Sequence, residues 1–118
     1  MLLTKNFDTK EFACPCCGAA RVSSKLIEML QVAREEAGIP FTITSGFRCR
    51  EHNMDVGGSN TSSHLRGLAA DLACNGSSQR YLMLTALLKA GFSRIGVGSD
   101  FIHVDVDATK AVGVIWTY

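Results

Sequence analysis

Two short strand patterns near the C-terminal end of the sequence are separated by only three residues. The first runs over 94–97 and the second over 101–106, and Gly98, Ser99 and Asp100 join them. A connection of this length is a tight hairpin signal, and a hairpin pairs its two strands antiparallel. This feature therefore directs the fold toward a largely antiparallel sheet.

Two further segments repeat apolar residues at helical spacing. The first covers 24–37, where Ser23 or Ser24 can cap the start and Gly38 supplies a left-handed stop. The second covers 77–90. We therefore expect two main helices.

The remaining patterns are strands and one long irregular segment. Short strands are expected over 41–44, 68–73 and 113–118, whereas 45–67 is rich in Ser, Gly, Asn and Thr without periodicity. An aperiodic segment of this length in a small domain is more often functional than idle. Two helices beside several short strands indicate an α+β fold, with a single domain over 1–118 and a mainly antiparallel sheet.

Size and charge limit the classes of partner. The chain has 118 residues and a net charge of +1, which gives no electrostatic reason to expect nucleic acid. The N-terminal segment lacks an apolar signal core, and no segment approaches the roughly 20 apolar residues that span a bilayer. We expect a monomer that is made in the cytoplasm without a signal peptide, has no membrane span and binds a small or locally recognised partner.

Three side chains form a potential metal-binding set. His64 and Asp71 lie seven residues apart, and Gly67 between them lets the chain turn into a strand. His103 lies on the polar face of a later strand, which it shares with Asp105. Two imidazoles and one carboxylate suit Zn²⁺, and a set of three leaves a fourth position open, as catalytic zinc requires. The predicted zinc ligands are His64, Asp71 and His103.

The residues around this set resemble a known family. The segment SSHLRGLAAD matches the Ser-x-His-x₆-Asp signature, and DFIH matches the Asp/Glu-x-x-His signature, of the zinc D-alanyl-D-alanine peptidases, which share a fold with lysostaphin and the hedgehog signalling domain. The segments SGFRCREHN and GVIWTY are similar to the small phage and bacterial members, so the resemblance runs from about Phe41 to Tyr118.

The resemblance implies an activity and roles for individual residues. It implies zinc bound by His64, Asp71 and His103, with Asp100 as the general base and Arg48 as the cation that polarises the scissile carbonyl. The implied substrate is a stem peptide of bacterial peptidoglycan, cut by a D-Ala-D-Ala carboxypeptidase or an L-alanyl-D-glutamate endopeptidase. Small size and the lack of an export signal favour the second type, in a phage or prophage endolysin that acts on the cell wall.

Other polar side chains leave two interpretations open. Ser62 either hydrogen-bonds the peptide substrate or caps a turn. His52 either contacts substrate or is structural. Asp105 is placed to support a ligand imidazole or to lie at the rim of the site.

The five cysteines are harder to interpret. Cys14 and Cys17, in CPCCG, have the spacing and the following glycine of a zinc-knuckle half-site. The other half is missing, because Cys49 and Cys74 are singletons in the sequence. Buried thiols are the default, and a second metal on Cys14, Cys16 and Cys17 stays an open alternative.

Two other function classes compete with hydrolysis. A non-catalytic zinc module that binds peptidoglycan or a protein would keep the metal ligands, and the presence of Asp100 argues against it. A non-haem iron oxygenase would use His103-x-Asp105, but its ligand triad needs a further histidine downstream, and none follows His103.

Overall fold

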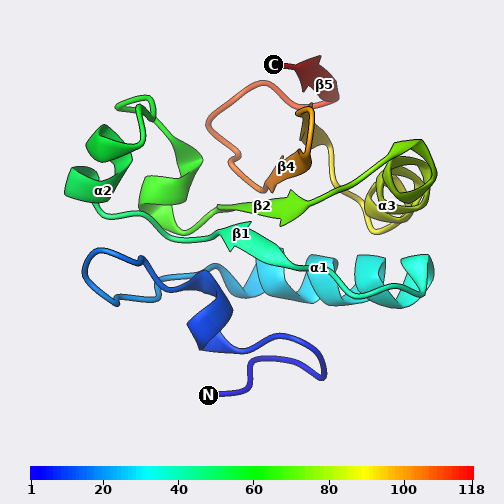
Figure 1. The fold of residues 1–118 in the computed structure, drawn as a ribbon, viewed down its shortest axis with the longest axis horizontal. Helices are drawn as coiled ribbons and strands as arrows, with labels where there is room; N and C mark the ends of the chain where they lie inside the picture. Colours follow the sequence, from blue (N-terminus) through cyan, green and yellow to red (C-terminus); the bar gives the residue numbers. More distant parts are fainter.

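The computed structural model describes residues 1–118 and contains one five-stranded sheet in the order β1-β2-β4-β3-β5 (Figure 1). The strands are β1 Ile43–Ser45, β2 Ala69–Ala73, β3 Arg94–Val97, β4 Phe101–Asp105 and β5 Val114–Thr117. The first four strands in this order pair antiparallel, whereas β5 runs parallel to β3. The predicted α+β class and the β3–β4 hairpin are confirmed.

Two helices cover the apolar face of the sheet. They are α1 Ser24–Ala37 and α3 Ser77–Lys89, close to the predicted bounds. The Ser23 hydroxyl accepts a hydrogen bond from a backbone N–H of the first turn of α1, and Gly38 ends the helix at φ 68°. Alternate strand residues and the inner stripes of both helices form one buried cluster, which includes Leu26, Leu30, Leu72, Met83, Leu87, Ile95, Ile102 and Val104. The opposite face of the sheet is left for polar side chains.

The predicted irregular segment 45–67 contains two short helices that the sequence did not reveal. They are α2 Arg50–Asp55 and the 3₁₀ helix η2 Ser63–Arg66. Each is too short to show apolar periodicity, and each begins at a local cap, the Cys49 sulfur for α2 and the Ser62 hydroxyl for η2. The turn out of η2 into β2 occurs at Gly67, whose φ is 68°.

The N-terminal segment lies below α1 in the view of Figure 1 and contacts β1 and the loop that follows it. It contains the 3₁₀ helix η1 Thr9–Phe12, and the fully buried Phe7 and Phe12 join the main core. The Phe12 carbonyl accepts a hydrogen bond of 2.9 Å from the N–H of Phe47, and a side chain at Gly46 would collide with the Phe12 backbone. This contact fixes the loop after β1, which leads to α2.

None of the helices combines the length and the apolar character needed to cross a bilayer.

Candidate metal centre

His64, Asp71 and His103 meet on the polar face of the sheet. Asp71 lies in the middle of β2 directly opposite His103 of β4, and η2 brings His64 over them. One ligand atom of each residue lies within 4.8 Å of the others. The structure therefore brings the predicted ligand set together from three elements, and its role as a zinc site stays a prediction.

Each histidine turns one ring nitrogen toward Asp71 and uses the other elsewhere. His64 Nε2 and His103 Nδ1 lie 3.3 and 3.0 Å from Oδ1 of Asp71. His64 Nδ1 lies 2.7 Å from the carbonyl oxygen of Gly46, and His103 Nε2 lies 2.8 Å from Oδ2 of Asp105. The carbonyl and carboxylate oxygens are acceptors, so the outer nitrogens, His64 Nδ1 and His103 Nε2, carry protons. When the rings are neutral, the inner nitrogens, which face Asp71, therefore have lone pairs.

The donor set fits a divalent cation. His64 Nε2 is a buried nitrogen without a hydrogen-bond partner, although a carboxylate oxygen is near. A lone pair that faces a carboxylate is unfavourable unless a positive charge lies between them. Two neutral imidazoles and one carboxylate, each oriented by a second partner, form the donor set that zinc takes in catalytic sites.

The charges around the set favour ionised carboxylates. Burial would raise the pKa of Asp71, but the neighbouring imidazoles of His103 and His64 lower it well below its usual range. Burial would likewise lower the pKa of His103, whereas Asp105 and Asp71 together raise it. Asp71 is therefore ionised, and its carboxylate at the centre of the set attracts a cation.

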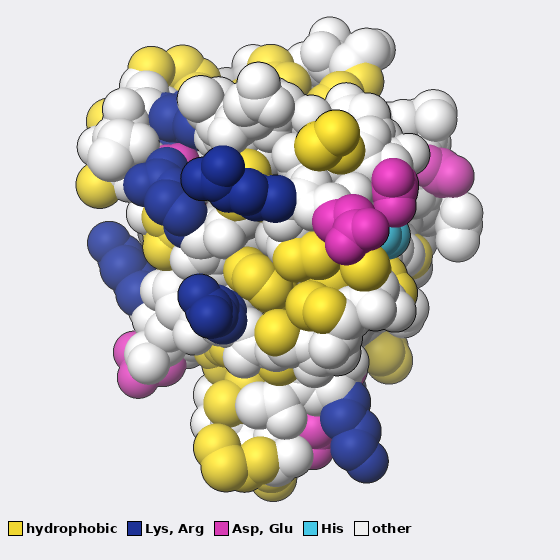
Figure 2. Space-filling view, turned by 90° about the vertical axis from the view of Figure 1, so that its left-hand side faces the viewer, with side chains coloured by type: hydrophobic (Ala, Val, Ile, Leu, Met, Phe, Trp, Pro, Cys, Tyr) yellow, Lys and Arg dark blue, Asp and Glu magenta, His cyan; other side chains and the backbone are white.

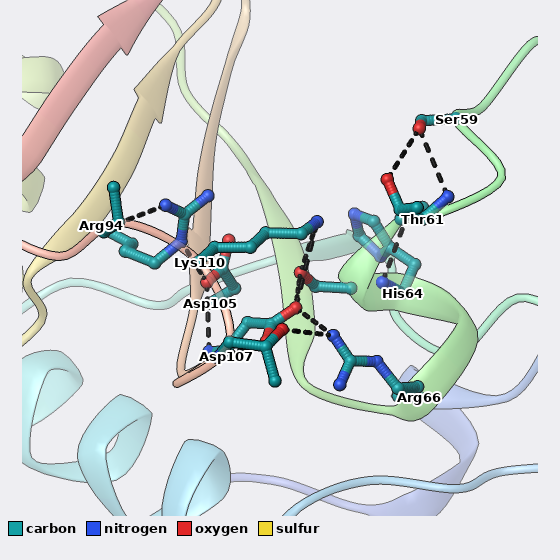
Figure 3. Close-up of polar contacts among 12 residues, drawn as sticks. Ser59, Thr61, His64, Arg66, Arg94, Asp105, Asp107 and Lys110 are labelled. Atoms are coloured by element: carbon teal, nitrogen blue, oxygen red, sulfur yellow. Dashed lines mark hydrogen bonds and ion pairs between the residues drawn. The ribbon is translucent and has the colours of Figure 1, made fainter.

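Asp105 is held in place from three sides. Its side chain is buried, and Oδ1 accepts hydrogen bonds from Arg94 Nε at 2.7 Å and from the backbone N–H of Asp107 at 3.1 Å (Figure 3). Oδ2 is left to accept the proton of the outer nitrogen of His103. Asp105 therefore fixes the orientation of the His103 imidazole and does not lie at the rim of the site.

The variant Asp105→Asn is expected to bind zinc about 10- to 100-fold more weakly, because loss of the outer carboxylate loosens and weakens a ligand imidazole. Competition with a chromophoric chelator measures the dissociation constant. The control is Asp8→Ala, since the Asp8 carboxylate caps η1 by accepting a hydrogen bond from the Lys10 N–H and does not touch the histidine set. It should lower the stability of the fold and leave zinc affinity nearly unchanged; equal losses of affinity in both variants would show that Asp105 acts only through stability.

A hollow of about 450 Å³ opens over the cluster. Its walls include Arg48, Ser62 and the aromatic residues Trp116 and Tyr118. Trp116 reaches over the sheet because its neighbour on β3 is Gly96, where a side chain would collide with the indole. The hollow has room for a peptide group next to the cluster.

Arg48 lies half-buried in the wall of this hollow. Its Nε atom is buried without a hydrogen-bond partner. Burial lowers the pKa of Arg48, and the negative charge of Asp71 acts in the opposite direction. The Arg48 backbone N–H donates to the carbonyl of His64 at 3.1 Å, which ties the arginine to the turn that carries His64.

The other predicted site residues lie at different distances from the cluster. Asp100 is exposed at the start of β4 and shares with Asp71 and Phe101 a neighbouring hollow of about 410 Å³, not the one that contains the histidines. Ser62 lines the histidine hollow and caps η2 by accepting a hydrogen bond of 3.3 Å from the His64 N–H. His52 lies on α2 and lines neither hollow.

The chain matches the model of the peptidase M15 family over residues 5–105, and it therefore belongs to that family. The M15 proteins are zinc-dependent metallopeptidases, in agreement with the resemblance. The match differs in extent from the resemblance, which ran from about Phe41 to Tyr118: it takes in most of the N-terminal segment and ends before GVIWTY. No curated protein matches the chain.

Proposed function

We propose that this metallopeptidase hydrolyses a peptide bond in the stem peptides of bacterial peptidoglycan. The observation that carries the proposal is the pair of inner histidine nitrogens that converge on Asp71 beside an open hollow. The outer nitrogens of both histidines are already hydrogen-bonded to Gly46 and Asp105, which orients the inner nitrogens toward Asp71. This orientation is that of metal ligands supported by outer hydrogen bonds. Family membership makes zinc the cation of choice.

The ligands would be His64 Nε2, His103 Nδ1 and the Asp71 carboxylate. Zinc in such a site supplies a Lewis acid and lowers the pKa of water toward ~7, which makes a nucleophile near neutral pH. Three protein ligands leave one position for water or substrate.

Asp100 would act as the general base. Asp100 is exposed, and it lines with Asp71 the hollow that borders the metal set. It would take the proton of the attacking water and pass it to the leaving amine. The Asp100 side chain would have to turn toward the histidine hollow when substrate binds, since catalytic contacts often form only in the complex.

Arg48 would meet the negative charge that develops on the carbonyl oxygen. A buried guanidinium nitrogen without a partner is available to a substrate acceptor. Removal of one such donor typically costs ~100- to 1000-fold in rate.

The surface next to the site favours an acidic peptide. A groove of about 620 Å³ adjoins Arg48 and is bordered by cationic side chains, namely Arg21, Arg48, Arg50, Arg66 and Lys110. Figure 2 views the side of the molecule that carries α2 and shows lysine and arginine side chains gathered there. Stem peptides carry free carboxylates at D-glutamate and at the terminal D-alanine, so the groove supports a stem peptide as substrate. Of the two family activities we propose that of an L-alanyl-D-glutamate endopeptidase, which the small size of the chain favours. This specificity would suit a phage or prophage endolysin.

Digestion of purified peptidoglycan tests the proposal. The zinc-loaded protein should release fragments with a new N-terminal D-glutamate, identified by mass spectrometry, and chelation should stop the release. New D-alanine without such fragments would overturn the endopeptidase assignment. Binding to peptidoglycan without any cleavage by the zinc-loaded protein would instead support the non-catalytic zinc module.

A further inference from the structure

A second group of metal-binding side chains lies outside the histidine site. Cys14, Cys17 and Cys49 place their sulfur atoms within 4.8 Å of one another. Cys49 precedes α2, 32 residues after Cys17 in the sequence. The fold thus brings a single cysteine to the knuckle-like pair and supplies the partner that the sequence did not reveal.

The chain around Cys14 forms a compact turn. Its carbonyl accepts a hydrogen bond of 2.8 Å from the N–H of Gly18, which adopts φ 75° and so closes a tight turn. The backbone N–H of Cys14 in turn donates a hydrogen bond of 2.8 Å to the carbonyl of Ala19. Backbone hydrogen bonds at both ends therefore hold the cysteine turn in the compact form that a metal site needs.

The spacing of the sulfurs distinguishes a metal from a disulfide. The Sγ atoms of Cys14 and Cys49 are 3.7 Å apart. A tetrahedral zinc with Zn–S bonds of ~2.3 Å separates its sulfurs by about 3.8 Å, whereas a disulfide needs about 2.05 Å. All five cysteines are free thiols.

We propose that Cys14, Cys17 and Cys49 bind a structural zinc ion, with Cys16 as the fourth ligand. Cys16 is exposed and is adjacent to Cys17 on the same turn, so a change of its side-chain rotamer can bring its sulfur toward the open corner of the site. Four thiolates complete a closed tetrahedral site of the structural type, and zinc binding displaces the protons of the thiols. This site is independent of the proposed peptidase activity.

The zinc would fasten the N-terminal segment to the loop that carries Arg48. Cys49 directly follows Arg48, and Cys14 follows η1, whose Phe12 already contacts that loop. Cys17, Arg48 and Cys49 also border the same basic groove. The metal would therefore hold one wall of the groove at a fixed distance from the histidine site.

Metal analysis of the full chain, purified under reducing conditions, tests the inference. The protein should contain about two zinc ions, and His103→Ala should retain about one. Cobalt substituted into His103→Ala should give the near-ultraviolet charge-transfer band of thiolate-bound Co²⁺, a readout that needs no cysteine variant. Absence of both the second zinc and this band would overturn the site, whatever the activity on peptidoglycan.

Cysteine variants identify the ligands. Cys49→Ser should lose the band and about one zinc ion, whereas the control Cys74→Ala, which removes a buried thiol remote from the cluster, should keep both. Cys16→Ser should weaken zinc binding and change the cobalt spectrum, and an unchanged spectrum would remove Cys16 from the ligand set. A mass lower by two hydrogens in protein purified without reductant, together with a single zinc, would show a disulfide in place of the metal.

Discussion

Replacing His103 with alanine is expected to empty the histidine site of zinc and to lower kcat/KM on peptidoglycan by more than about 1000-fold. The change removes one of three ligands and leaves Asp71 facing a single imidazole. Two remaining ligands do not hold zinc against solvent at ordinary concentrations, so the chemistry that depends on it stops. The fold should survive, because Asp105 keeps its hydrogen bond from Arg94.

Three measurements separate loss of metal from loss of structure. Zinc content by elemental analysis should fall by about one ion per chain in His103→Ala, while circular dichroism stays that of the parent protein. His52→Ala serves as the control for zinc content, since this histidine lies on α2 away from both hollows. Chelation should silence the parent protein and added zinc should restore it, but zinc should not restore His103→Ala. A variant that keeps its zinc and its activity would remove His103 from the ligand set.

Elements specified by local chemistry were predictable from the sequence. The bounds of α1 follow from its caps, the serine before it and Gly38 after it, and the structure matches the predicted range. The β3–β4 hairpin follows from its three-residue connection. The direction of β5 was not predictable, because parallel pairing with β3 depends on where the chain returns after residue 105 and no local residue encodes it.

In the candidate site too, some features follow from local sequence and others depend on contacts between distant segments. The convergence of Asp71 and His103 follows from two strands whose polar residues face the same side. The sequence allowed Asp105 either to support the His103 imidazole or to lie at the rim of the site. The orientation of the imidazole decides between these two interpretations, and it depends on the folded structure. Cys49 could not be assigned, since its distance to Cys14 is set by the packing of the N-terminal segment against the loop after β1.

The position of Asp100 is the largest difference between the expected and the observed site. Its spacing from His103 suggested a carboxylate directed at the reacting centre. In the structure Asp100 precedes β4, its backbone carbonyl accepts a hydrogen bond from Cys74, and its side chain remains in solvent. A residue before the first strand pairing is not oriented by the pleat, so strand alternation does not determine where it points.

The variant Asp100→Asn is expected to lower kcat by about 100- to 10,000-fold while the zinc content stays at the parent level. The amide has almost the shape of the carboxylate but cannot take a proton from water. Because Asp100 is exposed and has no ion pair, the substitution should leave stability unchanged. KM should change little, since a general base acts mainly in the transition state.

The matched control is Asp55→Asn, which neutralises another exposed aspartate without an ion pair, at the end of α2. It should retain full activity on peptidoglycan, so that any loss in Asp100→Asn reflects position and not net charge. Full activity of Asp100→Asn with zinc bound would show that the proton goes elsewhere. Asp100 would then serve to bind substrate in the hollow that it lines with Asp71, and KM would be the constant to rise.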